Sequence, residues 1–153
     1  MAKTKVLFLC TGNSCRSQMA EGWFRELAGN EFEVFSAGIA PAGLNPLAVA
    51  VMREVGIDIS RQRSKHAGEY LGQNFPYVIT VCDSAREHCP IFPGTYKKLH
   101  WSFEDPAGAH GSQEERLRVF RRVRDEIGEQ VREFVKAAAM ATRVPARAES
   151  SQR

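Results

Sequence analysis

Short apolar runs alternate with segments of helical periodicity along most of the chain. Apolar runs bounded by polar loops are typical of strands, and they predict four strands, at residues 6–9, 32–36, 77–81 and 96–101. Between the first two strands, residues at helical spacing predict an amphipathic helix with Ala20, Trp23, Phe24 and Leu27 on one face. That helix is expected to end at Gly29, and a second helix, from Leu47 to Val55, is expected to end at Gly56.

The clearest helix signal comes last. Ser112 followed by Glu115 has the pattern of a capping box, which begins a helix. An apolar stripe follows, made of Leu117, Phe120, Ile127, Val131 and Phe134. Arg and Glu fill the opposite face and indicate a solvated surface. After Ala139 the periodicity stops, so the pattern predicts one domain at 1–137 and a disordered tail at 138–153.

Strands that alternate with helices favour an α/β fold, here a single domain with a four-stranded parallel sheet flanked by helices. The length of 153 residues fits one hydrophobic core. In such sheets ligands bind beyond the carboxyl ends of the strands. Cys10 and Cys82 each follow a predicted strand directly, and Asp105 lies shortly after the fourth. The pattern therefore brings three reactive side chains to one edge of the sheet.

Composition narrows the class of protein. The net charge is +3, and three arginines against one glutamate in 138–153 account for +2 of it, which argues against a nucleic-acid face on the body. No apolar run approaches the roughly 20 residues of a membrane span. The first residues lack an apolar secretory signal, so a cytoplasmic location is expected. The four cysteines then favour chemistry over a disulfide scaffold.

The segment from Cys10 to Arg16 has the features of an oxyanion-binding loop. Gly12 and Asn13 tolerate the positive φ values that turn successive N–H groups inward, and the next helix directs its N-terminus at the same point. Arg16 can hold two oxygens of a tetrahedral anion. The same donors would stabilise a sulfur anion, so a depressed pKa is expected for Cys10. The predicted loop comprises Cys10, Thr11, Gly12, Asn13, Ser14, Cys15, Arg16 and Ser17. A strand–turn–helix with an inert cysteine is the alternative.

Cys82 and Cys89 flank a polar segment, and two structural roles compete with a chemical role for them. A zinc site is disfavoured, because the cysteine spacings do not match the usual short pairs and Cys10 and Cys15 lie beside an arginine. We therefore predict no metal site. A pair of buried cysteines is disfavoured by the polar residues between them. The four histidines show no metal-ligand spacing and are interpreted as surface or loop residues: His66, His88, His100 and His110.

The run VLFLCTGNSCRSQMAE at 6–21 resembles the start of thioredoxin-coupled arsenate reductases, which share the fold of low-molecular-weight protein tyrosine phosphatases. The resemblance covers about residues 4–136. It implies that Cys82 and Cys89 are the two redox cysteines that distinguish the reductases from the phosphatases. It also implies that Asp105, in an Asp-Pro pair, is the general acid, although a turn cap is the alternative role. Cys15 has no partner in this scheme and is interpreted as structural.

The resemblance implies a reaction sequence. Cys10 attacks arsenate, Asp105 protonates the departing hydroxide, and Cys82 then attacks Cys10 so that arsenite leaves. Cys89 takes over the disulfide, and thioredoxin reduces it. No tightly bound cofactor is expected, phosphate and sulfate should compete with arsenate, and the chain should act as a monomer. Glutaredoxin or a small thiol is an alternative reductant.

Two other functions remain open at this point. One is a protein tyrosine phosphatase that uses only Cys10, Arg16 and Asp105. The other is a non-catalytic module that binds an oxyanion or senses redox state.

Two further expectations concern the surroundings of the loop. Some members of the family bind potassium through an Asn, a Glu, a Ser and an Asp; Asn13, Glu21 and Ser36 match, but Lys65 replaces the Asp. We expect the Lys65 ammonium to take the place of the ion. Between the redox cysteines, residues 83–88 are predicted to form a short helix in the reduced protein.

Overall fold

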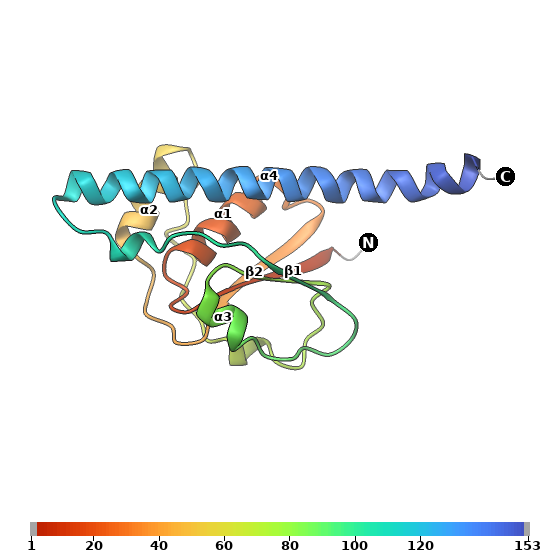
Figure 1. The fold of residues 1–153 in the computed structure, drawn as a ribbon, viewed down its shortest axis with the longest axis horizontal. Coiled ribbons are helices and arrows are strands. Elements are labelled where there is room, and N and C mark those ends of the chain that lie inside the picture. The colour runs from red at the N-terminus through yellow and green to blue at the C-terminus, as the bar shows by residue number, and fades with distance from the viewer. Residues whose placement is uncertain (1–2, 152–153) are drawn as a thin grey trace.

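The computed structural model describes residues 3–151 and contains one four-stranded sheet. Its strands are β1 (Thr4–Cys10), β2 (Phe32–Gly38), β3 (Tyr77–Thr80) and β4 (Lys97–His100). Figure 1 labels two of its strands, β1 and β2, beneath the long helix α4 (Gln113–Ser151). The spatial order is β2-β1-β3-β4, and every neighbouring pair is parallel. The predicted α/β fold with a four-stranded parallel sheet is therefore confirmed.

The connections between strands are helical. The structure contains α1 (Arg16–Ala28), α2 (Pro46–Glu54), α3 (Asp83–Glu87), α4 (Gln113–Ser151) and the short 3₁₀ helices η1 (Ala67–Tyr70) and η2 (Pro106–Gly108). Helix α4 packs along α1 and α2, whereas α3 contacts β1 and β3. Figure 1 shows α3 on the opposite side of the sheet from α4. The segment around α3 thus stands apart from the main helical layer.

Strand β1 is the centre of the core. Its residues Val6, Leu7, Phe8 and Leu9 are fully buried, as expected for a parallel strand covered on both faces. Register brings Cys10 opposite Gly38 on β2 and Leu9 opposite Thr80 on β3. Because these strands end at one edge, the loop after β1 lies beside the segment after β3.

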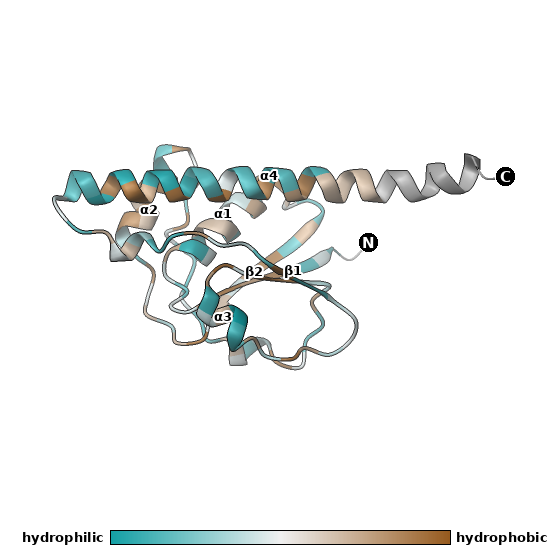
Figure 2. Ribbon diagram, in the orientation of Figure 1, coloured by the Kyte–Doolittle hydropathy of each residue, from teal (hydrophilic) through white to brown (hydrophobic). Residues whose placement is uncertain are grey.

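The final helix begins as its sequence predicts. The Ser112 backbone N–H donates to Glu115 Oε1 at 3.1 Å, and the Glu115 N–H donates to Ser112 Oγ at 3.2 Å. These reciprocal bonds confirm the capping box. Figure 2 shows hydrophobic and hydrophilic residues alternating along α4, in keeping with one buried and one solvated face. In the predicted stripe, Phe120, Ile127 and Val131 are buried, and Leu117 and Phe134 are partly buried.

The end of the chain differs from its prediction. Instead of a disordered tail from residue 138, α4 continues to Ser151, and residues 152–153 lie outside the described residues. Alanine has the highest helix propensity, and 137–139 are three alanines that extend a helix already nucleated by packing. The absence of an apolar stripe therefore did not mark the end of the helix. In the part of the chain that the structure describes, no helix is long and apolar enough to cross a membrane.

Helices α1 and α4 approach closely at Gly128. A Cβ atom placed there would lie 2.7 Å from Trp23 Cε2, and the Trp23 ring is fixed because its Nε1–H donates to Arg124 O at 3.0 Å. We predict that Gly128→Ala lowers the urea midpoint of unfolding. The overpacking costs about 1–3 kcal/mol, against roughly 1 kcal/mol that alanine gains in a helix.

Gly108→Ala is the matched control for this prediction, because the space around a Cβ there is open. A Gly128→Ala protein with the urea midpoint of the control would contradict the close approach of the two helices.

Candidate active site

The loop after β1 turns its carbonyl oxygens toward the chain segment after β2. Four loop carbonyls accept backbone N–H bonds of 2.8–3.1 Å, in the pairs Cys10–Ile39, Thr11–Ala40, Gly12–Ala42 and Ser14–Asn45. With the carbonyls engaged on that side, the loop N–H groups are available to the other, and the Asn13 N–H lies 3.0 Å from Cys10 Sγ. Helix α1 then begins at Arg16, as predicted. The arrangement is that of an anion-binding nest.

Asn13 holds the loop in shape. Within the described residues its φ of 47° is the only positive φ at a residue other than glycine, and Gly12 is not among the positive-φ glycines. The prediction of positive φ is therefore confirmed at Asn13 and wrong at Gly12. The side chain is fully buried and uses all its hydrogen-bonding capacity. Its Nδ2 donates to Ser17 Oγ and Ser36 Oγ, and its Oδ1 accepts from Gln18 Nε2 and the Lys65 N–H.

These bonds set the direction of the Ser17 hydroxyl. Because Ser17 Oγ accepts from Asn13 Nδ2 at 2.8 Å, its own hydrogen is free to point at Cys10 Sγ, which is also 2.8 Å away. A hydroxyl aimed in this way stabilises the thiolate over the thiol. Ser17 is therefore placed to donate to Cys10 Sγ. Ser14 contacts Cys15 Sγ at 3.7 Å instead.

The expected depression of the Cys10 pKa is wrong for this structure. Cys10 is 2% exposed, and burial raises the pKa of its thiol, because a thiolate loses more hydration than a thiol. The hydrogen bonds from Ser17 and Asn13 and the charge of Arg16 act in the opposite direction and are outweighed. The sequence pattern identified these donors and could not show how deeply the sulfur lies.

Arg16 and Asp105 come together from distant segments. Arg16 Nη1 donates to Phe103 O at 3.1 Å, and Arg16 Nη2 lies 3.7 Å from Asp105 Oδ2. Asp105 Oδ1 also accepts from the Ala107 N–H at 3.0 Å and so caps η2. The general-acid role and the cap role that the sequence left open are thus compatible in one side chain, which is half exposed. Its placement beside Arg16 puts it at the mouth of the loop.

Cys82 lies next to the same loop. Its Sγ is 3.2 Å from Thr11 Oγ1 and accepts from the Ala85 N–H at 3.4 Å, so it also caps the N-terminus of α3. The side chain is buried, at 7% exposure, although the polar sequence around it predicted otherwise. The reason is the sheet edge: Val81 is hydrogen-bonded to Leu9 O, and this directs Cys82 into the junction of the two loops.

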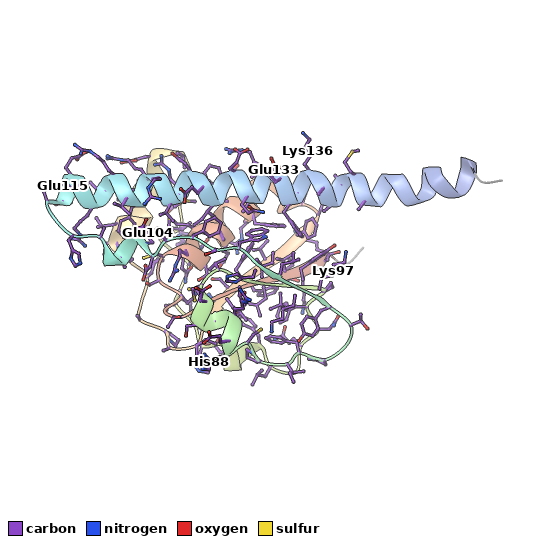
Figure 3. The ribbon with its side chains drawn as sticks, viewed as in Figure 1. His88, Lys97, Glu104, Glu115, Glu133 and Lys136 are labelled. Carbon is purple, nitrogen blue, oxygen red and sulfur yellow. The ribbon has the colours of Figure 1, made fainter. Side chains whose placement is uncertain are left out.

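Cys89 is held away from Cys82 by α3, which confirms the predicted short helix. Its sulfur is partly buried and contacts Pro90 O at 3.5 Å. Burial raises the pKa of the Cys89 thiol, and the nearby Lys98 opposes this shift. The neighbouring His88 lies at the outer surface, on the side of the molecule away from α4 (Figure 3). All four cysteines are free thiols in this structure.

Cys15 takes a structural place in the loop. It is 3% exposed, and burial raises the pKa of its thiol to about 11. Among the residues that the structure describes, no group of three or more His, Cys, Asp or Glu side chains is arranged to hold a metal ion.

The residues that match the potassium site of some family members bond directly to one another. Ser36 Oγ donates to Glu21 Oε1 at 2.5 Å, and Arg25 Nη2 pairs with Glu21 Oε2 at 2.5 Å. Lys65 is 7% exposed and its Nζ donates to Arg63 O at 2.6 Å, within the electrostatic reach of Glu21. Burial lowers the pKa of Lys65, and the charge of Glu21 opposes this shift. Asn13, Glu21 and Ser36 suit a cation poorly, because Asn13 turns its NH₂ group rather than its amide oxygen toward Ser36.

His100 was missed as a residue of interest. The sequence suggested a surface or loop position, but His100 ends β4 and hydrogen-bonds through both ring nitrogens, to Thr80 and to Asp83. Only the pairing of β3 with β4 brings these three residues together, so nothing in the local sequence signals the contact.

Comparisons with known proteins agree with this geometry. The family model for low molecular weight phosphotyrosine protein phosphatase matches residues 5–144. An arsenate reductase from Halalkalibacterium halodurans is 52% identical over 134 residues, which cover 88% of this chain and 96% of that protein. The solved structure of an arsenate reductase in the phosphate binding state has a TM-score of 0.71 at 34% identity and covers 88% of this chain and 98% of its own. A thioredoxin-dependent arsenate reductase from Corynebacterium glutamicum has a TM-score of 0.70 at 28% identity, with 91% of this chain and 63% of that chain covered.

We predict that Ser17→Ala slows alkylation of Cys10 at neutral pH. Loss of the hydroxyl removes one hydrogen bond to the thiolate, and the pH–rate profile for iodoacetamide should shift upward by about one pH unit. In the unsubstituted loop the rate should already rise from pH 7 to 9, because burial raises the pKa of Cys10. Peptide mass spectrometry in a Cys82→Ser, Cys89→Ser background follows Cys10 alone. Ser102→Ala, at an exposed position, is the control, and an unshifted Ser17→Ala profile contradicts the assignment.

We also predict that potassium and sodium act alike on this protein. Lys65 supplies a positive charge near Glu21 from within the chain. Exchanging sodium for potassium at constant ionic strength should therefore leave the melting temperature and the turnover rate unchanged. A rise in either that is specific to potassium would show the inference to be mistaken.

Proposed function

This chain belongs to the low molecular weight phosphotyrosine protein phosphatase family, among its arsenate reductases, and we propose that it reduces arsenate to arsenite with Cys10 as nucleophile. The observation that carries the proposal is the 3.2 Å between Thr11 Oγ1 and Cys82 Sγ, which sets a second buried thiol against the oxyanion loop. A phosphatase does not need a thiol there. A reductase does need one, because an electron donor has to reach the nucleophile.

In the proposed reaction the loop binds arsenate as it would phosphate, so phosphate and sulfate compete. The N–H groups of the loop and the N-terminus of α1 donate to its oxygens, and Arg16 is positioned at the mouth to hold two of them. Its present contacts with Phe103 O and Asp105 are ones that an incoming oxyanion can share or replace.

The first chemical step joins sulfur to arsenic. The Cys10 thiolate attacks the arsenic atom, and the arsenic–oxygen bond to the leaving group breaks as Asp105 gives its proton to the departing hydroxide. Water leaves, and a thiol–arsenate adduct remains on Cys10. Since burial raises the pKa of Cys10, formation of the thiolate is the step that the Ser17 and Asn13 donors assist.

The second step transfers two electrons. The Cys82 thiolate attacks Cys10 Sγ, the sulfur–arsenic bond breaks, and its electron pair stays on arsenic, which leaves as arsenite. Cys89 then attacks Cys82 and releases Cys10 as a thiolate. Thioredoxin, the reductant suggested by the thioredoxin-dependent structural relative, reduces the Cys82–Cys89 disulfide. We expect a monomer acting in the cytosol, where thiols are kept reduced.

A phosphatase activity is the second candidate, supported by the family to which the fold belongs. It would use the same first step, with Cys10, Arg16 and Asp105. Steady-state arsenite production with thioredoxin, thioredoxin reductase and NADPH separates the functions. Turnover of a phosphate ester without reductant and no arsenite would favour the phosphatase, and neither activity would favour a non-catalytic binding module.

Substitutions of the cysteines should divide the reaction into steps. Cys10→Ser should abolish arsenite production while the protein stays folded, because oxygen and sulfur are similar in size. Cys89→Ser should release about one arsenite per enzyme and then stop as a Cys10–Cys82 disulfide, which mass spectrometry can identify. Normal turnover by a folded Cys10→Ser protein removes the mechanism.

Oxidation should open α3. In a helix, residues seven apart are separated by about 10.5 Å, at roughly 1.5 Å of rise per residue, whereas a disulfide tolerates a Cα separation of about 4.4–6.8 Å. In the structure the five-residue helix α3 (Asp83–Glu87) lies between Cys82 and Cys89, and we expect closing of their disulfide to unwind it. We predict much faster hydrogen exchange across residues 83–92 in the oxidised than in the reduced protein. Equal protection would contradict the unwinding without affecting the cysteine assignments.

A further inference from the structure

The redox helix α3 has few attachments to the body of the protein. Of its five residues only Ala85 is buried, and the other four side chains are exposed. Cys82, just before the helix, is tied to the loop by Thr11. In the part of the chain that the structure describes, the hydrogen bond between Asp83 and His100 is the only side-chain bond from α3 to another strand or helix.

This bond is one of two hydrogen bonds that link Thr80, His100 and Asp83. His100 stands opposite Thr80 in the parallel register of β3 and β4, and its Nδ1 lies 2.8 Å from Thr80 Oγ1. Its Nε2 lies 3.2 Å from Asp83 Oδ1. The imidazole therefore bridges the sheet and the first residue of α3.

The chemistry of Asp83 and Thr80 decides which ring nitrogen of His100 donates and which accepts. An ionised carboxylate only accepts, so Nε2 carries the hydrogen and donates to Asp83. In the neutral ring Nδ1 is then an acceptor. The Thr80 hydroxyl has one hydrogen and two acceptors within reach, His100 Nδ1 at 2.8 Å and Leu99 O at 3.4 Å, and the shorter distance favours donation to the ring. The Thr80 side chain is buried, and the His100 side chain is only 19% exposed. Because Thr80 holds the Nδ1 side of the ring, His100 presents its Nε2 donor to Asp83 in a fixed orientation.

We propose that His100 is a positioning residue for the redox cascade: it holds Asp83, and through it the first turn of α3, in the reduced conformation that keeps Cys82 beside the Cys10 loop. In this proposal the bond breaks when the segment unwinds at Asp83 during oxidation. It therefore stabilises the dithiol over the Cys82–Cys89 disulfide. Since the Asp83 carboxylate is 81% exposed, the bond is weak enough to break at each turnover.

This role rests on the proposed function, because it assumes that Cys82 and Cys89 exchange between dithiol and disulfide. The exchange can be measured in the full-length Cys10→Ser protein against dithiothreitol. Two electrons and two protons pass from Cys82 and Cys89 to oxidised dithiothreitol, which leaves the protein disulfide and reduced dithiothreitol. Alkylation followed by mass spectrometry gives the equilibrium constant.

His100→Ala should raise the equilibrium constant for disulfide formation by about 1.5-fold to fivefold, the effect of one exposed ion pair. The redox potential becomes more negative, because the reduced form loses a bond that the oxidised form lacks. His100→Gln keeps an amide donor and should return the constant toward the original value. His110→Ala, an exposed histidine substitution in the loop after β4, should leave it unchanged.

A double-mutant cycle isolates the bond from other effects of each substitution. Asp83→Ala should raise the constant on its own, and in a His100→Ala background it should raise it by less. Additive shifts, or a constant unchanged by His100→Ala, would overturn the role of His100 while the cysteine cascade stands. Failure of the Cys10→Ser protein to form a Cys82–Cys89 disulfide at all would overturn the proposed function and this role with it.

Discussion

The buried amide of Asn13 is the constraint on which the site depends. A residue other than glycine at a φ of 47° is strained, and here four side-chain hydrogen bonds from three segments compensate for the strain. The same bonds turn the Ser17 hydroxyl toward Cys10, and the turn at Asn13 brings its own N–H to the sulfur. Loop shape and nucleophile activation therefore have one origin.

Burial and activation oppose each other at Cys10. The sulfur sits at the end of a fully buried strand, where the apolar surroundings favour the neutral thiol. The loop stabilises the thiolate with hydrogen-bond donors close to the sulfur rather than with solvent. A nucleophile in such a place is shielded from chance oxidants, because the thiolate is the reactive form. Its chemistry is then governed by what the loop binds.

Stability is distributed unevenly between the two faces of the sheet. On one face, α1, α2 and α4 pack on the core through large apolar side chains such as Trp23 and Phe120. On the other, α3 depends on Ala85 and a few polar contacts at its first turn. A segment that must open during a redox cycle is expected to come from the weakly held part of a fold. In the proposed reaction the weakly held segment ends at Cys89, which has to move, while the oxyanion loop leads into the firmly packed helix α1.

The sequence alone determined the fold class, the four strands, the start of α4 and the loop from Cys10 to Ser17, because these follow from periodicity and from residues close together in the chain. The strand pattern also placed Cys82 and Asp105 at the edge of the sheet, and the resemblance added Cys89 and the roles proposed for all three. The tertiary structure decided the rest. Strand pairing and loop packing bury Cys10 and so raise its pKa, and they bring Arg16 to Asp105. They also create the hydrogen bonds that link Thr80, His100 and Asp83. Such contacts join residues far apart in sequence, and no local pattern encodes which of them will touch.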